Sequence, residues 1–141
     1  MRKKIIIFFF AFFSMVAAAQ ERNLWSPVSE AEIGRNLFEA RVRPAEFKLF
    51  RLQEALFKSD LSNAPSEKNI SAKASSFIIT IPNPGGQFEQ YRVVEAPVMH
   101  PDLAARYPGI KSFAGSAVNN PLQVIRFDAS PLGFHAIVMV P

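Results

Sequence analysis

The chain has 141 residues, of which 16 are basic and 12 are acidic, and it contains no cysteine. This length is enough for one domain with a hydrophobic core. The lack of cysteine excludes disulfides, thiol enzymes, zinc-thiolate sites and a lipid anchor on an N-terminal cysteine. Eleven prolines predict many turns and interrupted strands.

The first 19 residues have the pattern of a secretory signal peptide. A basic start at residues 2–4 precedes an apolar stretch at residues 5–19, which is shorter than the roughly 18–20 residues of a membrane span. We predict cleavage after Ala19, with Ala17 and Ala19 as the small residues of the cleavage site and Gln20 as the new N-terminus. We therefore expect a periplasmic or secreted protein without a membrane segment. An uncleaved anchor is the alternative.

Most of the net positive charge of the chain lies in this predicted signal peptide. Three of the 16 basic residues, and none of the 12 acidic ones, lie at residues 2–4, so that little of the net charge of +4 remains after cleavage. A nearly neutral chain without a cluster of Lys and Arg does not favour nucleic acid or an anionic membrane as a partner.

We expect residues 20–141 to form a single α+β domain, in which antiparallel hairpins pack with one or two short helices. Ser29 and Glu32 match a capping box and predict a short helix, and Trp25 before it is expected to anchor the core, with carbohydrate stacking as the alternative. Partial alternation predicts a strand at residues 46–52. The spacing of apolar residues predicts a helix at residues 53–61.

Two hairpins are the strongest structural predictions. Residues 77–95 contain two β-branched or aromatic runs around a turn rich in Pro and Gly, and residues 122–140 alternate on both sides of a four-residue turn. Between them we expect a short helix at residues 102–107, a strand at 110–114 and a loop at 115–121. The predicted buried residues are Phe47 or Phe50, Leu56, Ile79, Ile81, Val93, Ile125, Phe127, Phe134 and Ala136.

No motif for catalysis, metal binding or a cofactor occurs in the sequence. The two histidines, His100 and His135, lack the spacing of a helical zinc pair, and no nucleophile or phosphate-binding motif is present. His100 lies close to Glu95 and Asp102 in the sequence. A carboxylate and imidazole cluster is possible there, but a cap on the following helix is the favoured interpretation.

Several sequence blocks occur together in one order. They are Leu24-Trp25, Arg43-Pro44-x-x-Phe47-x-x-Phe50-x-Leu52, Leu61-x-x-Ala64-Pro65, Glu95-Ala96-Pro97-Val98-Met99-His100-Pro101 with Tyr107-Pro108 after it, and Ile125-Arg126-Phe127-x-x-Ser130-Pro131-x-Gly133-x-His135-Ala136. This order resembles the N-terminal region of secreted reprolysin-type zinc metallopeptidases of Flavobacteria and other Bacteroidetes. The block that begins at Glu95 is its most specific part.

The resemblance implies a non-catalytic, propeptide-like module that assists folding of a metallopeptidase catalytic domain or masks it. The zinc-binding helix of that family has no counterpart in this chain, so no catalytic residue is carried over. The apolar C-terminal residues, which end at Pro141 without a polar tail, suggest a truncated domain.

The segment 95–107 is the expected contact with the catalytic domain, because its prolines hold an irregular path that a sheet does not absorb. The candidate contact residues are Glu95, Pro97, Met99, His100, Pro101 and Tyr107. Within them, His100 is the residue that could approach a catalytic zinc. A stand-alone exported binding or adhesion module is the alternative function, and a small exported hydrolase is a weaker third one.

Overall fold

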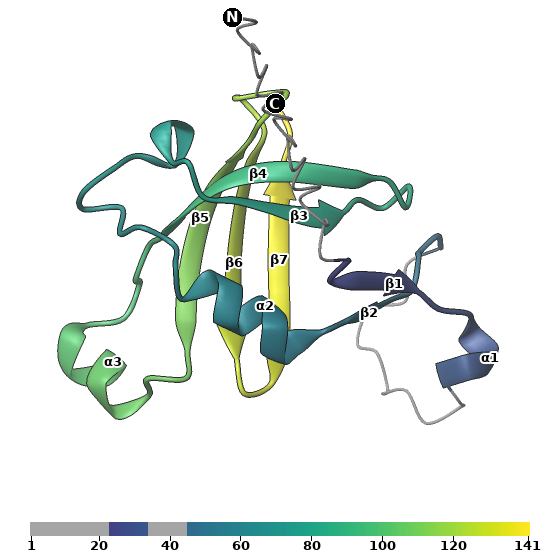
Figure 1. Ribbon diagram of the computed structural model, residues 1–141, viewed down its shortest axis with the longest axis horizontal. Coiled ribbons are helices and arrows are strands. Elements are labelled where there is room, and N and C mark those ends of the chain that lie inside the picture. Colours follow the sequence, from purple (N-terminus) through teal and green to yellow (C-terminus); the bar gives the residue numbers. More distant parts are fainter. Residues whose placement is uncertain (1–22, 34–44) are drawn as a thin grey trace, which may run out of the picture.

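A five-stranded antiparallel sheet forms the centre of the protein (Figure 1). The computed structural model describes residues 23–33 and 45–141. The strand order is β3-β4-β5-β6-β7, with β3 at Ile78–Pro82, β4 at Phe88–Glu95, β5 at Lys111–Ala117, β6 at Val124–Ser130 and β7 at Gly133–Met139. A second sheet pairs β1 (Trp25–Pro27) with β2 (Phe50–Leu52). The predicted α+β class and both hairpins are confirmed.

Three α-helices and a 3-10 turn complete the described part of the chain. They are α1 at Glu30–Ile33, α2 at Glu54–Leu61, η1 at Ala72–Ala74 and α3 at Pro101–Arg106. The predicted signal peptide, its cleavage residues Ala17, Ala19 and Gln20, and the Arg43-Pro44 motif lie outside the described residues.

The large sheet twists strongly, so that β3 and β4 run across the direction of β6 and β7 in Figure 1. α2 lies against one face of this sheet and is fastened to the turn after β6, because the Lys58 ammonium donates a hydrogen bond to the Ser130 carbonyl at 2.8 Å. One half of the predicted capping box before α1 forms, since the Glu32 carboxylate accepts from the Ser29 N–H at 2.9 Å, while the Glu32 N–H donates to the Ser29 backbone carbonyl at 3.1 Å.

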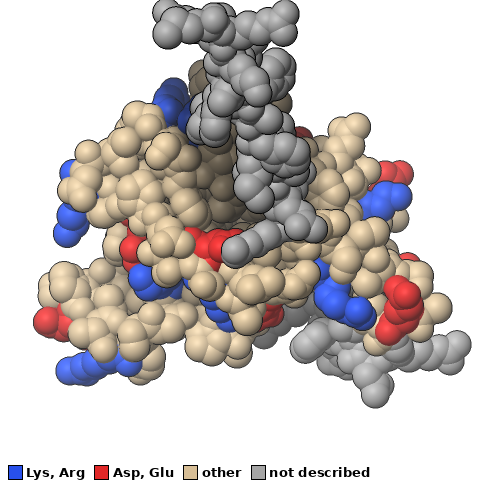
Figure 2. Space-filling view, in the orientation of Figure 1, with Lys and Arg blue, Asp and Glu red and all other residues tan. Residues whose placement is uncertain are grey.

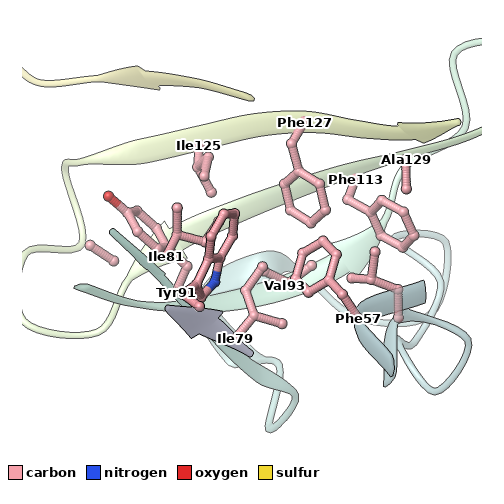
Figure 3. Packing of buried hydrophobic residues seen from close by; sticks show 12 residues of the cluster. Phe57, Ile79, Ile81, Tyr91, Val93, Phe113, Ile125, Phe127 and Ala129 are labelled. Atoms are coloured by element: carbon pink, nitrogen blue, oxygen red, sulfur yellow. The ribbon is translucent and has the colours of Figure 1, made fainter. Parts of the chain in front are cut away.

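Aromatic rings fill the space between α2 and the sheet (Figure 3). Phe113 and Phe127 stack with their centroids 4.9 Å apart, and Phe57 from α2 meets Phe134 edge-on at 5.2 Å. Trp25 from β1 reaches the same group, with its ring 5.7 Å from that of Phe134. The core therefore joins α2 and the small sheet to the large sheet.

Gly115 allows β5 to pass close to its neighbours in this core. A Cβ at this position would lie 2.6 Å from Cγ2 of Ile125 and 3.1 Å from the backbone oxygen of Arg92. Residues 115–117 were expected in a loop, and the structure instead places them in β5. The prediction failed because Gly115 is required by tight packing within the sheet and does not mark a turn.

A buried hydroxyl completes the pairing at the start of β3. The Ser75 hydroxyl donates to the Val93 carbonyl at 2.7 Å and accepts from the Phe77 N–H at 3.1 Å. The hydroxyl thus bridges Phe77 and Val93. These two residues are also joined directly, because the Val93 N–H donates to the Phe77 carbonyl at 2.9 Å. The segment before β3 is in this way joined to β4.

Several predicted positions are corrected by the structure. The buried face of α2 consists of Phe57 and Leu61, whereas Leu56 is 43% exposed, because the apolar stripe was placed one position too early. Phe47 is exposed, and Phe50 is half-buried against the core. The predicted strand at 46–52 is reduced to the three residues of β2.

The other predicted core residues divide by their strand. Those on β3, β4 and β6, namely Ile79, Ile81, Val93, Ile125 and Phe127, are buried as expected. On β7, Phe134 is half-buried and Ala136 is exposed, which contradicts the prediction. The residues of β7 alternate between the two faces of the sheet as predicted, but few side chains of the described residues cover this strand.

Candidate functional site

A cavity of about 730 Å³ lies between β7 and the far end of the β3–β4 hairpin. Alternate residues of β7 line one side of it: Phe134, Ala136, Val138 and, just after the strand, Val140. The opposite side is formed by Ile81, Pro82 and the turn that follows, and Trp25 and Phe50 contribute aromatic rings from the small sheet. The cavity is the gap that remains because the two edge strands of the twisted sheet do not pair with each other.

A polar cluster forms part of the cavity wall. The Glu89 carboxylate accepts hydrogen bonds from the Tyr91 hydroxyl at 2.6 Å, the Gln123 amide at 2.6 Å and the Asn83 amide at 2.9 Å. Gln123 also donates to the Tyr91 hydroxyl at 2.7 Å. In Figure 3 this hydroxyl points away from the apolar cluster that holds the ring of Tyr91. The carboxylate is thus held in place by three neutral side chains.

These bonds shift the protonation of two groups. The pKa of Glu89 lies below its ordinary value, chiefly because the Tyr91 hydroxyl and then the Asn83 amide stabilise the ionised carboxylate. Burial, followed by the bond to Glu89, raises the pKa of Tyr91 to about 12. At neutral pH the cluster therefore consists of an anionic carboxylate and a protonated phenol.

The edge of β7 that faces away from β6 has no partner strand in the described chain. The Ala117 N–H at the end of β5 donates to the Gln123 carbonyl, just before β6, at 2.9 Å. Every second residue counted from Gln123 along β6 therefore directs its backbone N–H and C=O groups towards β5. The alternation of an antiparallel ladder then directs the backbone groups of Phe134, Ala136 and Val138 away from β6. These groups border the cavity.

The other side of β7 is equally uncovered by the described residues. Ile137 is 64% exposed, and Met139 is also exposed. The strand contains no Lys, Arg, Asp, Glu or Pro, which are the residues that commonly protect an edge strand from pairing. Cavity, polar cluster and free edge together form the candidate site of this protein.

Histidine 135 belongs to a polar row on the outer face of the sheet. The strand register places Ser112, Asp128 and His135 side by side, and His135 Nδ1 lies 3.4 Å from Asp128 Oδ2. Asp128 is on the middle strand, so Ser112 and His135 are separated by two strand spacings, about 10 Å. The imidazole therefore does not reach the serine hydroxyl as a general base, and the row is not a catalytic triad.

The segment predicted to contact a partner runs from the end of β4 to the end of α3. Glu95 pairs with Lys111 at 3.1 Å, and Glu95, Pro97 and Met99 border a small cavity of about 230 Å³ together with Ile110. Pro101 and Tyr107 are exposed and do not line it. The structure thus groups only half of the six predicted residues.

His100 has the capping position that the sequence favoured. Its Nδ1 accepts from the Asp102 N–H at 3.4 Å at the start of α3, and it also lies 3.6 Å from the Asp102 carboxylate. The side chain is largely exposed.

The sequence analysis did not identify the Glu89 cluster. Glu89 and Tyr91 are two positions apart and share a strand face, which is a signal that could have been read. Gln123 lies 34 residues beyond Glu89 and precedes β6, and only the strand order brings it beside them.

Surface charge and metal ligands offer no second candidate in the described part of the chain. On the face seen in Figure 2, basic and acidic residues are interspersed and separated by uncharged surface. Among residues 23–33 and 45–141, no three His, Cys, Asp or Glu side chains gather as metal ligands would. No helix in these residues has the length and apolar character of a membrane span.

Comparison of the chain with protein-family models, with curated proteins and with solved structures finds no match.

Proposed function

We propose that this protein is an exported, non-catalytic module that binds another polypeptide through β7. The observation that supports the proposal is the state of this strand, which contains no Lys, Arg, Asp or Glu. Its edge has no partner strand among the described residues, and they leave its outer face uncovered. A strand of this kind is a template for an added strand from a second chain. The sequence resemblance suggests the partner: a reprolysin-type metallopeptidase catalytic domain, which the module would help to fold or would mask.

The contact surface in this proposal includes β7 as well as the predicted segment. Val98, from segment 95–107, and Ile137, from β7, border one shallow depression on the outer face of the sheet. A domain bound over β7 would therefore also reach segment 95–107. The proposal does not use His100 as a zinc ligand, since its Nδ1 accepts the Asp102 N–H at the start of α3.

The test adds the purified protein to a reprolysin-type catalytic domain from the same organism and measures proteolysis and the yield of refolding. We expect the wild type to inhibit the enzyme or to raise the refolding yield, and Ile137→Lys to lose this effect. Ile78→Lys is the matched control, since Ile78 is an exposed isoleucine on the other edge strand. No effect of the wild type on either measurement would refute the partner.

The stand-alone binding module remains the second candidate, and the same strand supports it. In that case β7 would bind a polypeptide that is not a metallopeptidase. Capture of a different partner by the wild type and by Ile78→Lys, but not by Ile137→Lys, would favour this candidate over the first.

A further inference from the structure

We propose that the cavity beside β7 binds an extended polypeptide segment as a sixth strand, and that Glu89 receives a Lys or Arg side chain of that segment. This inference rests on the proposed function and specifies the chemistry of the ligand. Three features carry it: the charge of Glu89, the composition of the cavity wall and the position of the free edge.

The negative charge of Glu89 has no counterion among the described residues. Its hydrogen-bond partners, Asn83, Tyr91 and Gln123, are all neutral donors. Lys48 also lines the cavity, but it forms no ion pair with Glu89 in the described chain, and its aliphatic part lies close to Gly86. A carboxylate that is fixed in an open cavity, without a cationic partner among residues 23–33 and 45–141, is complementary to an incoming cation.

The walls of the cavity fit the rest of such a side chain. The aliphatic part of Lys or Arg would lie along Val138, Val140 and Ile81, and aromatic rings of Tyr91 and Phe134 border the same space. Apolar walls with a few convergent polar groups are the usual composition of a ligand site, and a volume of about 730 Å³ is within the usual range. Cations are also attracted to aromatic rings.

The free edge indicates a polypeptide as the source of the cation. The outward backbone groups of β7 border the cavity, so a strand paired with them would direct every second side chain into it. All neighbouring strands of the large sheet are antiparallel, which suggests the same direction for the added strand. Gln123 precedes Val124, which pairs with Met139, so the Glu89 cluster lies near the end of β7. The basic residue would therefore be near the beginning of the added strand.

The experiment measures binding of a blocked heptapeptide, acetyl-Lys-Thr-Val-Thr-Leu-Thr-Val-amide, through the fluorescence of Trp25. This is the single tryptophan of the chain, and it lines the cavity. A second peptide carries Gln in place of Lys. We expect the Lys peptide to bind the wild type at least tenfold more tightly than the Gln peptide, with a difference that decreases as the salt concentration rises.

Glu89→Gln should bind both peptides with equal affinity. Glu95→Gln, which removes a carboxylate at the opposite end of β4, is the matched control and should retain the preference for Lys. Thermal unfolding of each variant shows whether it is folded. An unchanged preference in a folded Glu89→Gln variant would overturn the inference.

The remaining outcomes separate this inference from the proposed function. Equal binding of both peptides to the wild type, lost in Val138→Pro, would retain strand addition and remove the role of Glu89. Butylamine binding as tightly as the Lys peptide would overturn the polypeptide ligand. A dimer in light scattering that Ile137→Lys converts to a monomer, without peptide binding, would assign the site to a second copy and overturn the inference. Absence of binding by either peptide at millimolar concentration would also overturn it, while the inhibition experiment still decides the proposed function.

Discussion

The two edges of the large sheet have opposite surroundings. At β3, Pro82 lacks an N–H, and the indole of Trp25 donates a hydrogen bond to the outward Thr80 carbonyl at 2.9 Å. Proline and a covering side chain are common means by which natural sheets prevent pairing at an edge. Within the described residues the edge at β7 has neither, although both strands border the same cavity.

This difference shows that the composition of β7 is not explained by packing within the described chain. Phe134 contributes to the core, but Ile137 and Met139 are on the outer face and are exposed. An isolated exposed apolar residue is ordinary, whereas a free edge strand with exposed apolar residues on both faces is a hazard for aggregation unless something binds it. The protected edge at β3 is therefore the reference against which β7 can be tested.

Among the substitutions that test this comparison of β3 with β7, replacement of Trp25 should lower the stability most. Trp25→Ala removes ring contacts with Phe57 and Phe134 and exposes the Thr80 carbonyl. We expect a loss of about 3–5 kcal/mol in the free energy of unfolding, measured with urea. Trp25→Phe keeps a ring but no donor, so it should cost less and still leave the edge of β3 uncovered. A loss below about 1 kcal/mol for Trp25→Ala would show that the small sheet does not protect β3.

Removing the Ser75 hydroxyl should have the next largest effect. In Ser75→Ala, the Phe77 N–H and the Val93 carbonyl lose their buried partner at the start of β3. An unsatisfied buried group costs about 1–3 kcal/mol, and we expect a destabilisation in this range in urea unfolding. Ser76→Ala, at an exposed neighbouring position, is the control and should change little. Equal stability of both variants would contradict the bridging role of Ser75.

The dependence of stability on pH should report on Glu89 and Tyr91 in the cavity wall and not on the two edge strands. The folded-state pKa of Tyr91 is about 12, above its ordinary value of 10.0, so the unfolded chain loses this proton first as the pH rises. The contribution to stability is therefore complete below about pH 10 and is lost as the pH approaches 12. The pKa of Glu89 is lowered, so its contribution is present above the ordinary value of 4.5 and is lost as the pH falls through the folded-state value.

Unfolding measured from pH 9 to 12 should show this alkaline loss in the wild type. Tyr91→Phe should lose stability at neutral pH, by about 1 kcal/mol for the bonds to Glu89 and Gln123, and should have a flatter alkaline profile. Tyr107→Phe is the matched control, because Tyr107 is exposed. An identical alkaline profile in Tyr91→Phe and the wild type would show that another group causes the loss.

The sequence predicted the elements that local patterns determine. Alternation along residues 77–95 and 122–140 placed both hairpins, and it selected the inward residues Ile79, Val93 and Ile125. The short helix near residues 102–107 and the cap at His100 also follow from local chemistry. These features depend on neighbours in the chain, which a sequence shows directly.

Features that depend on strand order were not predictable in the same way. Leu56 and Phe57 are adjacent and both apolar, and only the docking of α2 on Phe127 and Phe134 decides that Phe57 is buried. Ala136 was expected in the core because β7 alternates correctly, but alternation says nothing about whether a partner covers a strand. The contact of Gln123 with Glu89 likewise requires β6 to lie two strands from β4.

The substitutions with the smallest expected effect on stability give the most direct test of the difference between the two edge strands. Ile78→Lys and Ile137→Lys each place a charge on an exposed isoleucine, one on β3 and one on β7. Both side chains are exposed, so both variants should remain within about 0.5 kcal/mol of the wild type in urea unfolding. Their association should differ, since a lysine on an edge strand opposes the pairing of strands. Light scattering over a range of protein concentrations should show that Ile137→Lys reduces self-association and that Ile78→Lys leaves it unchanged, because Pro82 and Trp25 already protect β3. If Ile78→Lys reduced association as much as Ile137→Lys, the edge at β3 would be open as well, and β7 would lose its distinction as the docking strand.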